Sequence, residues 1–421
     1  MAHASLVSTL ANNKYVNLEV QSALNRCNLE GPDKGLYSAI VYGCIERLIT
    51  LDFIISSLSS RPVSEIDDST LCAIRIGICQ MAFMDKIPAH AAVDESVELA
   101  PKKSRGFVNA ILRSYLRKKP PMPKKEDGFV RYLSINYSVP EELCELFVRD
   151  FGSEAEDIFA AFLEREKIYL HLNPLRPRSY AEAEKLGAEK SRLCPDVVSV
   201  PCFDGALEGL EKGLWIVQDE ASAYAAYVLG AKAGELVVDT CAAPGGKSFA
   251  IAMGMENKGE IHSFDLHDNK INLIKKGARK LGIEIISAEA RNAKVPREDL
   301  IGKADKVLCD APCSGLGVIG KKPDIKYKAL DAIEGLPRVQ AEVLRGAAKY
   351  VKPGGTLVYS TCTLNPRENE ENVIRFLNEN PNFAAVDFTV GTLSSTGGML
   401  TLAPHIHHTD GFFIAKLLRL S

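Results

Sequence analysis

Short apolar segments, several of which end in an acidic or small polar residue, recur through the C-terminal half of this 421-residue chain. They are Glu235–Asp239, Ile261–Asp265, Ile283–Ile286, Lys306–Asp310, Thr356–Ser360 and Phe412–Leu417. Stretches with helical periodicity, such as Asp268–Leu281, lie between them. This alternation predicts a doubly wound α/β sheet over residues 206–421. Ligands of such sheets bind at the carboxyl ends of the strands, so functional residues are expected directly after these segments.

The N-terminal part of the chain has a different pattern, in which apolar residues recur at helical spacing. One such set is Leu71, Ile74, Ile78 and Met81. This spacing predicts an all-α domain over residues 1–122, which ends where Pro120, Pro121 and Pro123 interrupt the chain. Residues 123–205 are expected to form a linker and a mixed α/β subdomain, whose role the pattern does not reveal.

Composition excludes several classes of protein. Hydrophobic residues make up 46% and charged residues 25% of the chain, which excludes dominant disorder. No apolar run approaches the roughly 18 residues that a membrane helix needs. The first 17 residues also lack the apolar core of a signal peptide. We therefore expect a cytoplasmic protein with no membrane partner, and a monomer because no repeat or coiled-coil pattern is present.

The eleven cysteines are spread along the chain without a CxxC pair, so we expect free thiols rather than disulfides. No metal is expected, because the cysteines and histidines near the C-terminus fit no familiar zinc spacing. Residues 101–125 contain nine Lys and Arg residues and no acid, although the whole chain carries a net charge of −3. Such a run is either a solvated helix face or a patch for RNA phosphates.

The segment DTCAAPGGKS, residues 239–248, follows the first expected strand. Gly245 and Gly246 allow a ligand to approach the backbone closely. The segment is not a phosphate-binding Walker loop, because Cys241 stands where that loop needs glycine. Asp265 ends the second strand, where an acid commonly holds the ribose of a nucleoside cofactor. A literal G-x-G-x-x-G at residues 315–320 is attributed to chance, because Lys-Lys-Pro follows where a helix should begin.

Two further strands are each followed by a cysteine. The segment DAPCSG begins at Asp310 and contains Cys313, and the segment STCT begins at Ser360 and contains Cys362. One cysteine at such a position is usually a buried thiol. Two cysteines in neighbouring loops, one of them close to Asp310, favour a chemical role.

These blocks, together with NPRENE after STCT and DGFFIAKL near the C-terminus, resemble the RNA cytosine-5 methyltransferases, and the match covers residues 206–421. Residues 90–97, HAAVDESV, and 105–110, RGFVNA, resemble a NusB-like RNA-binding helical domain. The combination resembles the RsmB (Sun/Fmu) family. The resemblance implies a multidomain chain, with an all-α NusB-like domain followed by an α/β Rossmann-like methyltransferase domain. It also implies S-adenosyl-L-methionine as cofactor and one cytosine of bacterial 16S rRNA, naked or in an assembling subunit, as substrate.

The resemblance assigns roles to individual residues. Cys362 would add to cytosine C6, Cys313 would assist product release, and Asp310 would contact the N3/N4 edge of the base. The cofactor would be held by Cys241, Ala242, Ala243, Pro244, Gly245, Gly246, Lys247, Asp265, Glu289 and Asp310. Glu289 departs from the family, which usually has Asp after the third strand. His171 replaces a family arginine and is expected to weaken an RNA contact above neutral pH.

Three alternatives stay open. A tRNA cytosine-C5 methyltransferase would share the chemistry, although a NusB-like half argues against it. A non-catalytic RNA-binding or antitermination factor would need neither Cys313 nor Cys362. An N- or O-methyltransferase would also need no cysteine pair, and would more naturally have an Asn/Asp-Pro-Pro-aromatic loop at residues 310–313.

Overall fold

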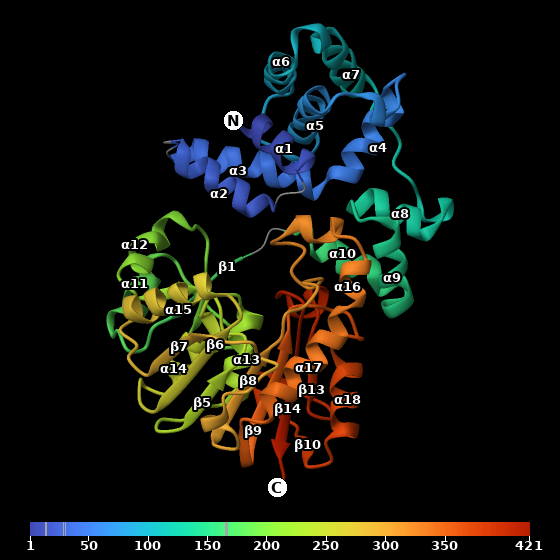
Figure 1. Ribbon diagram of the computed structural model, residues 1–421. Helices are drawn as coiled ribbons and strands as arrows, with labels where there is room; N and C mark the ends of the chain where they lie inside the picture. The colour runs from blue at the N-terminus through green and yellow to red at the C-terminus, as the bar shows by residue number, and fades with distance from the viewer. Residues whose placement is uncertain (13–14, 28, 30, 165–166) are drawn as a thin grey trace. The chain divides into compact units, whose positions relative to one another are not determined.

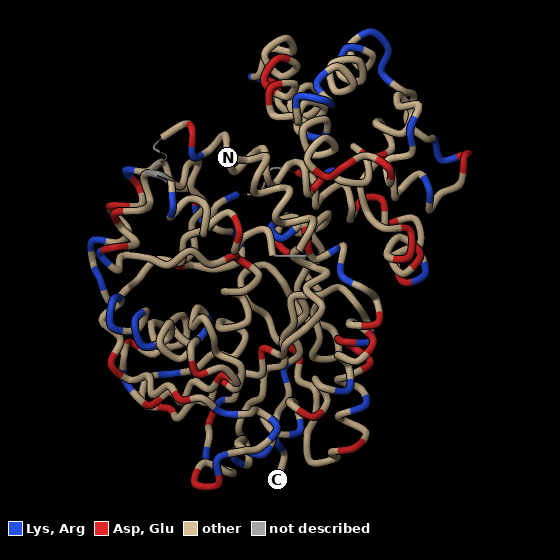
Figure 2. Tube along the Cα trace, turned by 45° about the horizontal axis from the view of Figure 1, so that its top comes forward, with Lys and Arg blue, Asp and Glu red and all other residues tan. Residues whose placement is uncertain are grey.

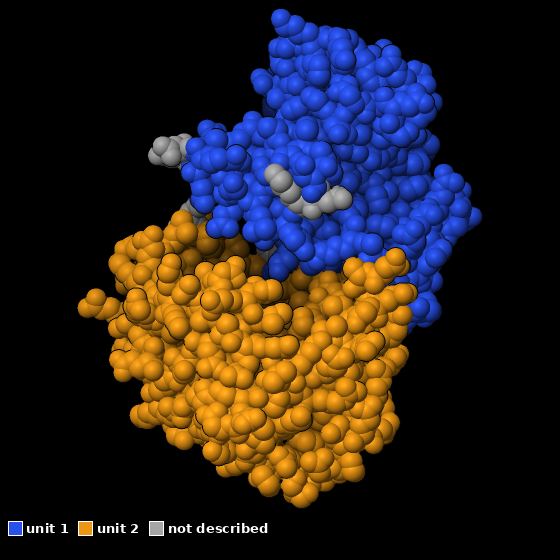
Figure 3. All heavy atoms as spheres, viewed as in Figure 1, with its two compact units in different colours: residues 1–164, 319–330 blue, residues 165–318, 331–421 orange. Residues whose placement is uncertain are grey.

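The computed structural model describes the whole chain except residues 13–14, 28, 30 and 165–166 (Figure 1). The contacts divide the chain into two compact units, which have different colours in Figure 3. Unit 1 comprises residues 1–164 and 319–330, and unit 2 comprises residues 165–318 and 331–421. No helix among the described residues is long and apolar enough to cross a membrane.

Unit 1 is helical, as the periodicity predicts. Its α-helices are α1 (Ala2–Ala11), α2 (Val16–Arg26), α3 (Gly31–Glu46), α4 (Leu48–Leu58), α5 (Asp68–Phe83), α6 (Ala89–Leu99), α7 (Arg105–Arg117), α8 (Phe129–Tyr137), α9 (Glu141–Phe151) and α10 (Glu154–Ala161). Its 3-10 turns are η1 (Val63–Glu65), η2 (Lys102–Ser104), η3 (Lys125–Asp127) and η6 (Pro323–Tyr327). Helix α5 is the most buried, since Leu71, Ile74 and Ile78 all lie in the core. The Asp67 side chain caps its N-terminus by accepting the backbone N–H of Thr70 at 3.0 Å.

Helices α8 to α10 pack with the N-terminal helices, which differs from the boundary expected at residue 122. Two hydrogen bonds join α8 to α4. The Thr50 hydroxyl donates to the carbonyl of Ile135 at 2.6 Å, and the Ile49 N–H donates to the Ser138 hydroxyl at 2.9 Å. The proline-rich stretch at residues 120–123 therefore lies inside unit 1, as a connection between two groups of helices.

Unit 1 also contains a segment from far along the chain. Residues 319–330 contribute η6, whose side chains cap the C-terminus of α3. Lys326 Nζ donates to the carbonyl of Glu46 at 2.6 Å, and the Tyr327 hydroxyl donates to the carbonyl of Ile45 at 2.8 Å. The last carbonyls of a helix have no partner within the helix, so these two donors replace water there. Burial lowers the pKa of Lys326 to about 7.

Unit 2 is built on an eight-stranded sheet with the order β10-β14-β9-β8-β5-β6-β7, in which β13 pairs with β14. The strands are β5 (Leu236–Asp239), β6 (Glu260–Asp265), β7 (Ile286–Ala290), β8 (Ala304–Asp310), β9 (Val351–Thr361), β10 (Phe383–Ala385), β13 (Met399–Leu402) and β14 (Phe412–Arg419). Strands β5 to β9 are parallel, and β14 is antiparallel to β9. The strand order reverses at β5, which is where doubly wound sheets bind ligands.

Helices cover both faces of this sheet. The helices α13 (Glu220–Leu229), α14 (Gly246–Gly254) and α15 (Asp268–Leu281) share one apolar cluster, and α17 (Leu336–Ala348) and α18 (Glu370–Glu379) share another. Successive strand residues alternate between the clusters, as Val237 and Val238 do. The shorter helical elements are α16 (Asp331–Glu334), α19 (Pro404–His407) and η5 (Glu298–Leu300).

A smaller antiparallel sheet precedes the large one within unit 2. Its order is β2-β3-β1-β4, from β1 (Ile168–Leu172), β2 (Glu189–Lys190), β3 (Val197–Val200) and β4 (Trp215–Val217). It carries α11 (Arg178–Lys185), η4 (Asp204–Ala206) and α12 (Leu207–Glu211). A two-stranded ribbon of β11 (Thr389–Val390) and β12 (Leu393–Ser394) lies later in the chain. The chain divides at residue 164, and the expected boundary at 205 falls within unit 2.

The expected strands of the large sheet are confirmed, with one shift. The structure places β7 at Ile286–Ala290 rather than at Ile283–Ile286. Residues 282–285 instead follow the end of α15, where Gly282 takes a positive φ of 75°. Glu289 is therefore inside a strand and not in the turn after it, which corrects the sequence-based placement.

We predict that Tyr327→Phe lowers the stability of unit 1 by about 1 to 3 kcal/mol, because the carbonyl of Ile45 loses its donor in a partly buried place. Urea unfolding of the full chain measures this change. Tyr15→Phe, which alters a side chain that is 52% exposed, is the control. Equal stabilities of the two variants would contradict the capping role of η6.

Candidate active site

The register of two neighbouring parallel strands brings the expected catalytic residues together. Strands β8 and β9 pair so that Asp310 lies opposite Ser360, and the Ala311 N–H donates to the Ser360 carbonyl at 2.9 Å. The two cysteine loops therefore leave the sheet side by side at the same edge. Cys313 and Cys362 are 49 positions apart in sequence, yet their Sγ atoms lie 3.2 Å apart.

The two thiols form a coupled pair. The hydrogen bond to Cys362, together with burial, raises the pKa of Cys313 well above its usual value. The Cys362 N–H also points at the Cys313 sulfur, 3.3 Å away. Cys313 therefore keeps its proton at neutral pH. No disulfide or metal cluster is present among the described residues.

Asp310 lies next to the cysteine pair with both carboxylate oxygens occupied. Lys247 Nζ donates to Oδ2 at 2.7 Å, and the Ser360 hydroxyl donates to Oδ1 at 2.7 Å. Burial lowers the pKa of Lys247, but the charge of Asp310 outweighs it and the net pKa is raised. Lys247 therefore stays protonated beside Asp310, and about a quarter of the Asp310 side chain is exposed to an incoming polar group.

The glycine-rich loop between β5 and α14 is folded for close approach of a ligand. Gly245 has a φ of 116°, and a Cβ there would lie 2.3 Å from the Phe249 ring. No residue with a side chain fits at this position. The Ala242 N–H donates to the carbonyl of Phe264 at 2.7 Å, which ties the loop to β6. The N-terminus of α14 therefore faces the end of the sheet where the strand order reverses.

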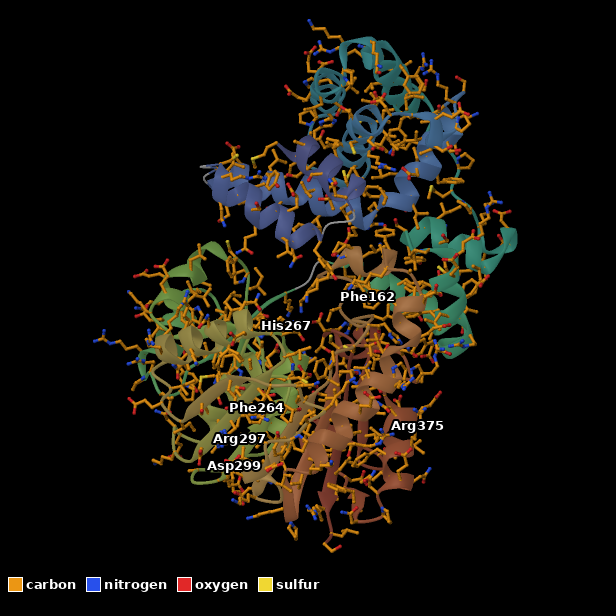
Figure 4. The ribbon with its side chains drawn as sticks, viewed as in Figure 1. Phe162, Phe264, His267, Arg297, Asp299 and Arg375 are labelled. Carbon is orange, nitrogen blue, oxygen red and sulfur yellow. The ribbon has the colours of Figure 1, made fainter. Side chains whose placement is uncertain are left out.

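Asp265 ends β6 beside this loop and beside His267, which is labelled in Figure 4. Its Oδ2 accepts the Ala243 N–H and its Oδ1 accepts the His267 N–H, each at 3.2 Å. A carboxylate accepts up to four hydrogen bonds, so each oxygen can still receive a hydroxyl. A glycine loop after β5 and a carboxylate after β6 fit the loop and ribose positions of a nucleoside cofactor.

Glu289, one strand further along, is held by arginines. Arg291 Nε donates to its Oε1 at 2.8 Å, and Arg297 approaches Oε2 at 3.6 Å. Arg297 also forms a two-bond pair with Asp299, and Figure 4 shows these two residues together. The Glu289 side chain is 38% exposed, so the proposed contact with an adenine has to share this carboxylate with two cations.

Asp239, the first residue of the glycine-rich motif, is fully buried behind the loop. Its Oδ2 accepts the Ser248 hydroxyl at 2.6 Å, while Oδ1 has no partner among the described residues. Burial raises the pKa of Asp239 to about 7. The side chain therefore keeps its proton over much of the range in which an exposed aspartate is ionised.

His171 lies inside unit 2 rather than on its surface. It is 2% exposed on β1, where its Nδ1 lies 2.8 Å from the Gln218 side-chain oxygen. Burial also lowers its pKa, so the side chain is neutral. A buried and neutral side chain offers no charge to RNA, which agrees with the expected weakening of a contact at this position.

Two polar residues at the site were missed by pattern analysis. Glu368 and Gln340 are fully buried, and both make hydrogen bonds to the Cys313 loop. Glu368 stands in the block NPRENE, but a glutamate in a polar run ordinarily predicts an exposed residue. Gln340 carries no signal at all, because it lies within an amphipathic helix.

The basic stretch at residues 101–125 spans η2, α7 and η3 of unit 1, and Figure 2 marks its Lys and Arg residues. Arg105 pairs with Glu98 at 2.8 Å, and Lys125 pairs with Glu156. Seven other cations of the stretch are exposed: Lys102, Lys103, Arg113, Arg117, Lys118, Lys119 and Lys124. They give this face of unit 1 a positive character.

Two family models match the chain. A model described as 16S rRNA methyltransferase RsmB/F matches residues 226–418, and a model of the NusB family matches residues 2–117. The chain is 36% identical to a probable ribosomal RNA small subunit methyltransferase B of Bacillus subtilis, over 99% of this chain and 97% of that one. A protein of the same description from Synechocystis is 34% identical, over 96% and 95% of the two chains.

Solved structures agree with these matches. The crystal structure of PH0851 has a TM-score of 0.80 at 29% identity, covering 98% of this chain and 96% of that one. The structure of NSun6 from Pyrococcus horikoshii with SFG, an analogue of S-adenosylmethionine, has a TM-score of 0.60 at 25% identity. That likeness covers 67% of this chain and 98% of the other.

We predict that Asp239 makes unit 2 less stable as the pH rises from about 4 to 7. The folded state holds a proton up to a pKa of about 7, whereas the unfolded chain releases it near the ordinary value of 3.8. Asp239→Asn removes this dependence. Between pH 4 and pH 8, the free energy of unfolding of the variant should therefore rise relative to that of the wild type by on the order of 3 kcal/mol. Denaturant unfolding at several pH values tests it, with Asp331→Asn at an exposed site as control. Parallel pH profiles for wild type and Asp239→Asn would contradict the burial argument.

Proposed function

The chain belongs to the RsmB/F family of 16S rRNA methyltransferases, which use S-adenosylmethionine, and we propose that it methylates C5 of one cytosine in 16S rRNA. The observation that carries the proposal is the pair of thiols 3.2 Å apart beside Asp310. Methylation of a nitrogen or an oxygen needs no cysteine, because those atoms already carry a lone pair. Carbon C5 of cytosine is a poor nucleophile and needs covalent activation.

The proposed reaction begins at Cys362. Its thiolate adds to C6, the C5–C6 double bond opens, and its electron pair moves toward C5. Asp310, held by Lys247 and Ser360, contacts the N3/N4 edge of the base and stabilises the protonated adduct. S-adenosylmethionine, when bound, supplies an electrophilic methyl group.

Product release returns Cys362 to its starting state. The proton on C5 passes to a water molecule, the electron pair of the C5–H bond forms the C5–C6 double bond again, and the bond between Cys362 sulfur and C6 breaks, so that Cys362 leaves as a thiolate. Cys313 is the group placed to assist this elimination, because its sulfur lies in contact with the sulfur that departs. The raised pKa of Cys313 keeps it protonated beside the Cys362 thiolate during the first step.

The cofactor would be held at the end of the sheet where the strand order reverses. The loop from Cys241 to Lys247 would contact it through backbone groups, and Asp265 would hold the ribose hydroxyls. Glu289 is the third candidate and would approach the adenine. The buried backbone contacts of the loop, such as that of Ala242 to Phe264, support this placement because they hold the loop in one conformation.

The RNA would be held in part by unit 1. Its exposed cations at residues 101–125 offer a surface for phosphates, and binding through them would weaken as salt increases. A target base within a folded rRNA helix has to leave its stack to reach the thiols.

We expect Cys362→Ala to abolish turnover, because no thiolate remains to add to C6. Cys313→Ala should instead accumulate a covalent complex of protein and RNA, because addition proceeds while elimination stalls. Denaturing electrophoresis with labelled RNA measures both variants, and Cys202→Ala at an exposed site is the control. Normal turnover by Cys313→Ala would refute the two-cysteine mechanism.

A transfer assay separates this proposal from its alternatives. Labelled S-adenosylmethionine is incubated with unmodified 16S rRNA and with bulk tRNA, and the product bases are resolved by mass. We expect 5-methylcytosine in the rRNA alone. 5-Methylcytosine in tRNA alone would support the proposed reaction but identify tRNA as the substrate. Methylation at nitrogen or oxygen would refute the cysteine mechanism, and no cofactor binding at all would favour a non-catalytic RNA-binding factor.

A further inference from the structure

Glu368 is a carboxylate buried next to the two thiols, with no exposed surface. Four donors from neutral groups lie within 3.0 Å of its oxygens, and Lys or Arg supplies none of them. They are the Ser314 N–H at 2.9 Å, the Ser314 hydroxyl at 2.6 Å, the Gln340 amide at 2.8 Å and the Asn365 amide at 3.0 Å. A buried carboxyl group that depends on four donors from two loops and a helix calls for an explanation beyond stability.

The partners of Glu368 flank Cys313 in the chain. Ser314 follows Cys313 and donates twice to Glu368. Pro312 precedes Cys313, and its carbonyl accepts the Gln340 amide at 3.0 Å from the same nitrogen that donates to Glu368. The loop that carries Cys313 is therefore held on both sides of the cysteine, through a carboxylate that belongs to the other loop.

Cys362 is flanked in the same manner. Asn369, the neighbour of Glu368, accepts the Thr361 hydroxyl at 2.5 Å and donates to the Thr363 carbonyl at 2.9 Å. The Thr363 hydroxyl in turn lies 2.7 Å from the Ser314 hydroxyl. Residues 368–369 thus contact the neighbours of both cysteines, in addition to the direct contacts between the two loops.

We propose that Glu368 is a positioning residue that sets the distance between the sulfur atoms of Cys313 and Cys362. It touches neither the substrate nor the reacting atoms, and it acts by holding Ser314 and the Gln340 amide in place. The positioning role itself does not depend on the proposed function. Its consequence, that both thiols serve in one turnover, rests on that function. A displacement of about 1 Å in such a pair is enough to cost about 100-fold in rate.

The variant Glu368→Gln tests the proposal with little change of shape. The amide replaces one acceptor oxygen by an NH₂ group. A hydrogen-bond donor then faces the groups that donated to the carboxylate. Glu220→Gln is the matched control, because Glu220 is also a buried glutamate of unit 2 that accepts a hydroxyl, from Ser191, and lies on α13. Thermal unfolding of both variants shows whether the fold is kept.

The first measurement is the rate of disulfide formation, which depends on the geometry of the two thiols and needs neither RNA nor cofactor. The full-length protein is treated with diamide, which takes two electrons and two protons from a pair of thiols and leaves a disulfide. Peptide mapping by mass follows the Cys313–Cys362 disulfide over time. We expect Glu368→Gln to form it at least about 10-fold more slowly than wild type and Glu220→Gln, because disulfide formation demands narrow geometry.

The second measurement is methyl transfer with binding of S-adenosylmethionine as its companion. Glu368→Gln should lose about 100-fold in kcat, while the Kd for S-adenosylmethionine changes by less than about twofold. In a Cys313→Ala background, the added Glu368→Gln change should also slow formation of the covalent complex with RNA. A role in stability alone would lower the melting temperature and move none of these readouts.

Equal disulfide rates in wild type and Glu368→Gln would overturn the proposal, whatever the enzymatic result. If disulfide formation is slower in Glu368→Gln but the wild type makes no 5-methylcytosine, the positioning role is supported and the proposed function is rejected. If Glu368→Gln does not fold, Ser314→Ala is used instead, because it removes one hydrogen bond to Glu368 and one to Thr363. A slower disulfide in Ser314→Ala supports the proposal, and an unchanged rate overturns it.

Discussion

The active site depends on the parallel pairing of β8 with β9. Because Asp310 lies opposite Ser360, two loops that are far apart in sequence start at the same level of the sheet. A slip by one residue would move every side chain of one strand to the opposite face. It would also separate Cys313 from Cys362 and take Asp310 away from the Ser360 hydroxyl. The chemistry therefore rests on a register that the packed core on both faces of the sheet maintains.

Four carboxylates lie near the ends of these strands, and the protein accommodates each in a different manner. Asp310 has Lys247 at 2.7 Å, and Asp265 has two backbone N–H groups, with Lys270 at 3.8 Å. Asp239 has little compensation and keeps its proton, while Glu368 is surrounded by neutral donors. The exposure of the four side chains also differs: about a quarter of Asp310 is exposed, whereas Asp239 and Glu368 have no exposed surface.

The sequence predicted the large sheet, and the proximity of the candidate residues, because both have short-range signals. An apolar run that ends in an acid predicts a strand and its carboxyl end, as at Asp239, Asp265 and Asp310. The boundaries of the units were less accessible, because they depend on contacts between distant segments. Lys326 has the sequence character of a surface residue, yet it caps α3 from 280 positions away. The burial of His171 on β1 also could not be inferred from its neighbours in sequence.

The glycines at residues 315–320 match a ligand-binding motif for a structural reason. A literal G-x-G-x-x-G suggests a phosphate loop, but Gly317 packs against the backbone of Gly411, where a Cβ would lie 1.9 Å from the Gly411 carbonyl oxygen. The Gly317 N–H donates to the Cys362 carbonyl at 3.0 Å, and its own carbonyl accepts the Gly411 N–H at 2.8 Å. Glycine is thus needed here for contact between backbones, not for a ligand. The start of β14 thereby supports the loops of Cys313 and Cys362, which explains why the DGFF segment belongs to the same constellation as the two cysteine motifs.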